Sequence, residues 1–261
     1  MGSAIATVVS RLLLSAPALN VSTDERSAMP DIHGRRLLAA TLSRCTRAGL
    51  CGLMILSAPP FPLAAPRGPQ QKGIVIDDFE SGTLAGWKIE RSGAGGWFVY
   101  TNGKTPPNPS ESDPNVPFEV PEPPRGKFAA VTDMNGPGRR ILYRDVKLDG
   151  RYTLHLTVFY VNAGPLSSPE TLDYESTGEN QQYRIDIVAP SAPVDSLAAA
   201  DVLANVFRTS PGDADRREPS AVTVDLSKWE GQTVRLRLAG VDNRGPLRAG
   251  VDDIRLEPAG R

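Results

Sequence analysis

From residue 73 onward, the chain repeatedly alternates apolar and polar residues with a period of two. The pattern is regular in "YTLHLTVFYV" (152–161), "YRIDIV" (183–188), "AVTVDL" (221–226) and "TVRLRLAGV" (233–241). A strand with one apolar and one polar face is typical of an antiparallel sheet that covers a core on one side and meets solvent on the other. No segment keeps a helical period over ten residues, so we predict an all-β domain over residues 73–258.

Shorter segments raise the expected number of strands to about ten or eleven. They are "GIVIDD", "GWFVYT", "KFAAVTD", "RRILYRDV", "VLANVFRT" and "GVDDIRLE". Glycine and proline number 24 each, which favours many turns between short elements. We therefore predict an antiparallel two-sheet β-sandwich of the jelly-roll type.

Two connections are long for a compact domain. Residues 103–126 contain eight prolines, and residues 162–181 are polar and acidic. Proline-rich chain is extended and stiff, with little hydrogen bonding of its own. Each segment either lines a binding face or is an unstructured insertion, and the sequence leaves both alternatives open.

Residues 29–65 have the organisation of a signal peptide. Basic residues lead into the apolar run "AGLCGLMILSAPPFPLAA" (48–65), which ends in small residues. The run is too short, and too interrupted by proline, to span a bilayer as a helix. We expect cleavage near Ala64 or Ala65, a linker over 66–72, and export to the periplasm or the extracellular space by the general or the twin-arginine route. Residues 1–28 are expected to be disordered or to precede the true start at Met29.

The residues left after cleavage exclude several kinds of catalytic chemistry. Both cysteines, Cys45 and Cys51, lie in the predicted signal peptide, and His155 is the one remaining histidine. Zinc sites of the His/Cys type and cysteine nucleophiles are therefore excluded. The formal net charge of -1 provides no field that attracts nucleic acid. We expect a domain without catalytic residues; the alternative is an enzyme that acts on polysaccharide through two carboxylates.

Acidic residues gather at the two ends of the predicted domain. "DDFE" (77–80) ends the first expected strand, and "DD" (252–253) begins the last. If the terminal strands pair, these carboxylates meet and repel one another unless a cation neutralises them, and Ca²⁺ takes carboxylate oxygens in irregular geometry. The alternative is that each acid caps a turn or pairs with an arginine such as Arg255. Strand parity directs Asp77 away from the others. The expected structural calcium ligands are Glu80, Asp78, Asp133, Asp252 and Asp253.

Five motifs in this order resemble one superfamily of β-sandwiches. "DDFESGTLAGW", "GGWFVYTNG", "TDMNGPGRRILYRDVKLDGRYTL", "WEGQTVRLRLAGVDN" and "GVDDIRLEP" are similar to the galactose-binding-like jelly rolls, which include carbohydrate-binding modules and MAM-like extracellular domains. The resemblance runs from Gly73 to Glu257. It implies about eleven strands and a structural calcium bound by Glu80 with Asp252 or Asp253. MAM domains usually carry disulfides, whereas this chain has no cysteine after residue 51.

Together these features predict an exported, non-catalytic domain that binds carbohydrate or a cell-surface protein, with no nucleic-acid partner and no transmembrane segment after cleavage. A purely structural or adhesive protein-binding domain is a further alternative. Sugar-binding modules present exposed aromatic rings, whereas Trp87 and Trp97 lie within the motifs and are expected in the core. The aromatic residues expected to be exposed and to contact a ligand are Tyr100, Phe118 and Tyr174.

Overall fold

The computed structural model describes residues 71–101, 120–132, 136–175 and 178–260. All described residues belong to one compact unit, which lies within residues 64–261. The predicted signal peptide, Asp133 and Phe118 lie outside the described residues. No helix within these ranges is long and apolar enough to cross a membrane.

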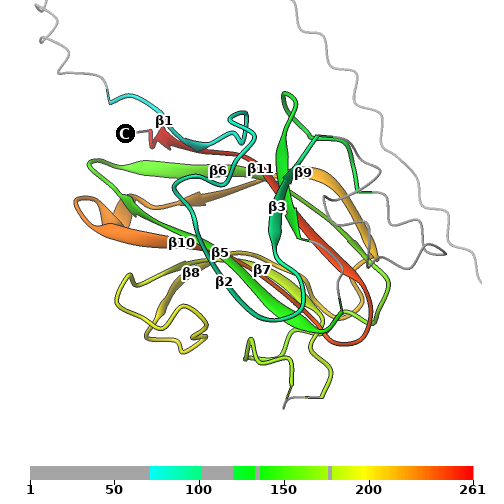
Figure 1. Ribbon diagram of the computed structural model, residues 1–261. Coiled ribbons are helices and arrows are strands. Elements are labelled where there is room, and N and C mark those ends of the chain that lie inside the picture. The colour runs from blue at the N-terminus through cyan, green and yellow to red at the C-terminus, as the bar shows by residue number, and fades with distance from the viewer. Residues whose placement is uncertain (1–70, 102–119, 133–135, 176–177, 261) are drawn as a thin grey trace, which may run out of the picture. The chain divides into compact units, whose positions relative to one another are not determined.

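Eleven strands in the described ranges form two antiparallel sheets, which face each other in Figure 1. The six-stranded sheet has the order β3-β4-β11-β6-β9, with β1 also paired to β11; the five-stranded sheet has the order β2-β5-β10-β7-β8. The prediction of an antiparallel two-sheet sandwich is confirmed, and so is the expected number of strands. The six-stranded sheet comprises β1 (Ile74–Asp77), β3 (Trp97–Tyr100), β4 (Ala129–Thr132), β6 (Tyr152–Asn162), β9 (Arg216–Asp225) and β11 (Leu247–Pro258). The five-stranded sheet comprises β2 (Lys88–Gly93), β5 (Gly138–Lys147), β7 (Gln182–Val188), β8 (Val202–Arg208) and β10 (Thr233–Asp242).

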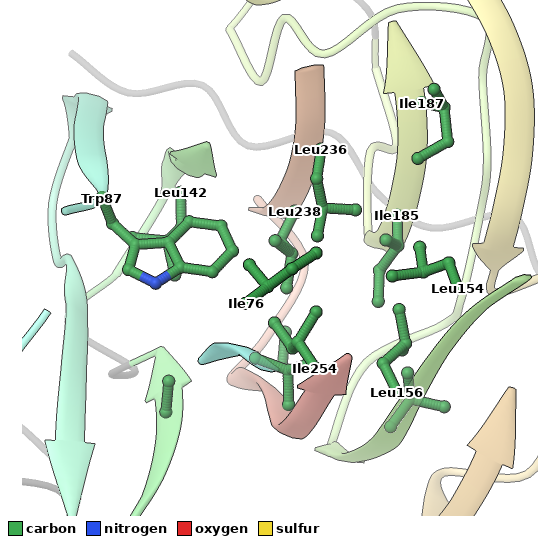
Figure 2. Close-up of a cluster of buried hydrophobic side chains, with 14 of the residues drawn as sticks. Ile76, Trp87, Leu142, Leu154, Leu156, Ile185, Ile187, Leu236, Leu238 and Ile254 are labelled. Atoms are coloured by element: carbon green, nitrogen blue, oxygen red, sulfur yellow. The ribbon is translucent and has the colours of Figure 1, made fainter. Parts of the chain in front are cut away.

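The main core lies between the two sheets. Alternate residues of each strand point inward, so that Leu154 and Leu156 of β6 approach Ile185 of β7 and Leu238 of β10 (Figure 2). The same cluster holds three tryptophans, whose burial confirms the core positions expected for Trp87 and Trp97. Their exposed fractions are 8% for Trp87, 3% for Trp97 and 7% for Trp229.

The outer face of the five-stranded sheet is also largely covered, contrary to the solvated face that period-two alternation predicted. A second cluster there packs Ile141 and Val241 against Leu172 and Leu197, which come from the long connections on either side of β7. Arg237, on the expected polar face of β10, is fully buried. It donates to the carbonyls of Val194 (2.9 Å) and Ser196 (2.6 Å), which ties the β7–β8 connection to the sheet.

Candidate functional site

The paired aspartates of β11 lie where this strand changes neighbours. On one side, β11 pairs with β4 at residues 250–251 and with β1 at residues 254–256. On the other side, its register against β6 shifts between Asp252 and Arg255, and Asp253 has a φ of 50°. An extra residue in one strand bends it and turns its side chains. The bulge therefore places Asp252 and Asp253 at the gap between β1 and β4.

Glu80 reaches the same gap from the turn after β1. Its Oε1 accepts hydrogen bonds from the backbone N–H groups of Lys127 (2.8 Å) and Phe128 (3.0 Å), which lower the pKa of this carboxyl. Gly126 lies directly against the carboxylate, since a Cβ there would be 2.3 Å from Glu80 Oε1, and its φ is 67°. Glycine is thus required for this contact.

Asp252 is completely buried and accepts backbone hydrogen bonds on both oxygens. Its Oδ1 accepts from Asp253 N at 2.7 Å and its Oδ2 from Arg125 N at 2.9 Å. Burial raises the pKa of Asp252 to about 7; the backbone bonds oppose this, and the nearby charges of Asp253 and Glu80 reinforce it. We call Glu80, Asp252 and Asp253 the acidic junction.

The structure brings together three of the five predicted calcium ligands. Asp253 forms ion pairs with the guanidinium groups of Arg125 (2.8 Å) and Arg255. For this residue the structure therefore agrees with the alternative to calcium binding, in which an acid pairs with arginine. Asp78 is exposed and accepts a hydrogen bond from Glu80 N at 3.2 Å, in a local turn. Within the described ranges, no three His, Cys, Asp or Glu side chains are arranged to hold a metal ion.

Asp77, expected to point away from the other acids, stabilises the turn that carries Glu80. Its two oxygens accept from Phe79 N at 2.8 Å and from the indole Nε1 of Trp87 at 2.7 Å. Phe79 has a φ of 57°, is fully buried and stacks on Trp87 with ring centroids 6.3 Å apart. Period-two parity missed this role because the chain leaves the strand at Asp77.

A cavity of about 160 Å³ lies at one end of the sandwich. Asp242 lines it and pairs with Arg140 at 2.8 Å, and both side chains are buried. Arg140 also donates to the Gly136 carbonyl at 2.6 Å. We call this the end cavity; its lining residues are Gly136, Pro137, Asp242, Asn243, Gly245 and Pro246.

Amide side chains hold the loops around the end cavity. Gln181 accepts hydrogen bonds from the backbone N–H groups of Asn243 (3.3 Å) and Arg244 (3.2 Å), and it donates to the Gly245 carbonyl at 2.8 Å. The Asn243 amide in turn donates to the Tyr174 carbonyl at 2.8 Å. These bonds join the acidic connection before β7 to the β10–β11 turn, so the cavity wall is preorganised.

Two of the three predicted ligand-binding aromatics lie in described ranges. Tyr174 is half-buried and lies beside the end cavity. Its hydroxyl and the carbonyl of Pro137, a cavity residue, both lie next to Gly93: a Cβ added to this glycine would be 2.7 Å from the hydroxyl and 2.5 Å from the carbonyl. Tyr100 is only 3% exposed, so the expectation that its ring is exposed is wrong. Its hydroxyl donates to the Pro121 carbonyl at 2.7 Å, because the end of the proline-rich segment returns to cover this ring.

No protein family matches the sequence, and no curated protein does. Among solved structures, the chain is similar to the K1 cleaved adhesin domain of Lys-gingipain from Porphyromonas gingivalis W83, at 14% identity and a TM-score of 0.41, covering 73% of this chain and 100% of that one. It is also similar to a family 11 carbohydrate-binding module from Clostridium thermocellum, solved with a β-1,3-1,4-mixed-linked tetrasaccharide, at 10% identity and a TM-score of 0.37. This match covers 73% of the present chain and 98% of the module. A third similar structure is TmCBM61, solved with β-1,4-galactotriose, at 13% identity and a TM-score of 0.38. This match covers 70% of the present chain and 94% of TmCBM61.

Proposed function

We propose that this chain is an exported, non-catalytic domain that binds carbohydrate at the end cavity. The observation that carries the proposal is the position of Tyr174 beside a cavity lined by Asp242 and Asn243. Small-molecule sites combine apolar walls with a few fixed polar groups. Pro137 and Pro246 supply apolar wall, and the half-buried Asn243 supplies a polar group. The aromatic ring of Tyr174 lies beside this wall, and the buried pair of Asp242 and Arg140 supports it from beneath.

The size of the cavity and the covered sheet define the class of sugar. The volume of about 160 Å³ is well below the roughly 300–1,000 Å³ of pockets that hold drug-sized ligands. Loops held by Arg237 cover much of the outer face of the five-stranded sheet, where a long chain would otherwise lie. A single sugar unit at the end of a glycan is therefore the ligand that this domain accommodates best.

The carboxylates support a binding role over an enzymatic one. A glycosidase needs two carboxyl groups that flank a bond of the substrate. Asp252 has the raised pKa of a general acid, but it is completely buried and both its oxygens accept backbone hydrogen bonds. Among the described residues that line the end cavity, Asp242 is the one that carries a carboxylate.

We also propose that a structural Ca²⁺ binds at the acidic junction, between Glu80 and Asp252. Carboxylate oxygens are the ligands that Ca²⁺ takes, and the charge of Glu80 already disfavours ionisation of the buried Asp252. A divalent cation there would relieve that repulsion and fasten the turn after β1 to β11. Asp253 takes no part, since two arginines neutralise it.

Screening the purified full chain on a glycan array, followed by calorimetry with the best glycan, tests the carbohydrate proposal. Wild type should bind glycans that share one terminal sugar, and Tyr174→Ala should weaken binding at least tenfold. Tyr143→Ala is the matched control, because Tyr143 is another half-buried tyrosine, held between Lys88 and Arg235 on the five-stranded sheet. No binding by wild type, or equal binding by Tyr174→Ala, would overturn the proposal.

Thermal unfolding with calcium or EDTA tests the metal proposal separately. Calcium should raise the melting temperature of wild type, and Glu80→Gln should abolish the rise. Asp78→Asn, an exposed acid two positions away, should keep it. An equal melting temperature of wild type in calcium and in EDTA would exclude a structural site.

A further inference from the structure

Four strands end the two sheet orders, and one of them has a regular edge with which no other described strand pairs. β3 has four residues, β9 contains Pro219, and the register of β8 against β7 shifts at two points. Short length, proline and bulges are the features that prevent a sheet edge from pairing with another chain. β2 has none of these features, since it pairs with β5 without interruption over all six of its residues, Lys88 to Gly93.

The side chains of β2 are arranged in a self-complementary way. Lys88 and Glu90 lie on the outer face of the sheet, where Lys88 lies over the Tyr143 ring and Glu90 pairs with Arg139. Ile89 lies opposite Leu142, a core residue, and is nevertheless 48% exposed because no strand in the described part of the chain covers its outer side. A positive, an apolar and a negative residue therefore follow one another along a free edge.

Symmetry restricts how two such edges can pair. Two copies of one strand related by a two-fold axis pair antiparallel, and residues opposite each other must point to the same face. A register centred on Ile89 places Lys88 of each copy opposite Glu90 of the other. Registers centred on Lys88 or on Glu90 place like charges opposite each other, which is destabilising. Among these three registers, the charges thus favour the one centred on Ile89.

We propose that β2 of this chain pairs antiparallel with β2 of a second copy, centred on Ile89. The pairing joins two five-stranded sheets into one continuous sheet and brings the two Ile89 side chains together. Centred on Ile89, the pairing joins Lys88–Glu90 of one β2 to the same residues of the other. So short a paired edge buries less surface than the roughly 1,200–2,000 Å² of a stable interface, so we expect a weak dimer that forms at high protein concentration. Gly93 adjoins Pro137 at the end cavity, so a dimer carries two cavities, at opposite ends of the paired strands. Such an assembly would bind a multivalent surface with avidity.

Sedimentation velocity over protein concentrations up to about 1 mM tests the proposal. Wild type should shift from monomer to dimer, and Lys88→Glu, which sets Glu against Glu90 of the second copy, should weaken association at least tenfold. The double variant Lys88→Glu/Glu90→Lys exchanges the two charges and should restore it. Arg139 keeps a partner in the double variant, because it also pairs with Asp195 at 2.6 Å.

Two results would overturn the proposal. One is a wild type that stays monomeric at every concentration, and the other is a Lys88→Glu variant that dimerises as wild type does. If the double variant fails to regain the dimer while its circular dichroism matches wild type, the register centred on Ile89 is wrong. Backbone amide exchange gives a second readout, since β2 amides should exchange more slowly as the dimer forms.

Discussion

Arg125 binds Asp252 through its backbone and Asp253 through its side chain. The backbone N–H of Arg125 donates to Asp252 Oδ2 at 2.9 Å across 127 positions of sequence, and its guanidinium lies 2.8 Å from Asp253 Oδ2. Glu80 holds the same loop two residues further on, at Lys127 N. One loop therefore closes the gap that the β11 bulge opens between β1 and β4.

Asp252 should make the fold less stable as the pH rises. Burial raises its folded-state pKa to about 7 from the ordinary value of 3.8, so the folded protein binds a proton that the unfolded chain has released between these pH values. Stability from this group is fully present below about pH 4 and is lost as the pH rises through about 7. In EDTA, the free energy of unfolding of wild type should therefore fall from pH 4 to 8 relative to that of Asp252→Asn.

Urea unfolding at five pH values measures this difference. Asp252→Asn is expected to be less stable overall, because one of two backbone N–H groups loses its acceptor, so the pH dependence is the informative quantity. Parallel pH profiles of the two proteins would show that Asp252 does not titrate in this range. Excess calcium should remove the decline of wild type if the cation binds the ionised carboxylate.

The sequence was sufficient to predict the sandwich and the convergence of its acidic ends. Period-two alternation specifies strands, and pairing of the terminal strands brings Glu80 to Asp252 and Asp253. The role of Arg125 could not be predicted, since its loop follows a long proline-rich segment with no periodic pattern. Parity also divides each strand into two faces without indicating which face a loop covers. That is why Tyr100, which was expected to be exposed, and Arg237, on the expected polar face of β10, are both buried.

Asp186→Asn should strongly destabilise the five-stranded sheet. Burial alone raises the pKa of Asp186, but hydrogen bonds and charge from Arg184 and Arg237 outweigh it and hold the pKa below its usual value. Arg237 lies 2.6 Å from this carboxylate, and both side chains are fully buried. Removing the negative charge leaves two buried guanidinium groups uncompensated, at a cost of about 3–5 kcal/mol.

Asp145→Asn is the matched control for this change. Asp145 also pairs with an arginine of β10, Arg235, at 2.7 Å, but its side chain is 35% exposed. Solvent screens such a pair, so the loss should be about 1 kcal/mol or less. Equal losses in urea unfolding for the two variants would mean that the Asp186 cluster contributes no more than an exposed ion pair.

Tyr100→Phe should lower stability without affecting carbohydrate binding. The variant keeps the ring, which packs against Phe159 with centroids 6.2 Å apart, but leaves the Pro121 carbonyl without the hydroxyl that now donates to it. An unsatisfied buried acceptor costs about 1–3 kcal/mol. Urea unfolding measures this loss, and titration with the glycan identified for wild type measures affinity. A tenfold loss of affinity in Tyr100→Phe would show that this buried residue acts on the binding site.

Gly250→Ala should destabilise the outer face of the six-stranded sheet through a single steric contact. A Cβ at this position would lie 1.9 Å from the Phe159 ring, which is fully buried and cannot move into solvent. Overpacking of this kind costs about 1–3 kcal/mol. Phe159→Ala costs about 3–5 kcal/mol by itself, but it also removes the atoms that the new methyl group meets. The double variant should therefore be clearly less destabilised than the sum of the two single variants.

Gly260→Ala, with no atom within 4 Å of the added carbon, should change stability by less than about 0.5 kcal/mol. Additive losses in the Gly250 and Phe159 cycle would show that another contact restricts position 250.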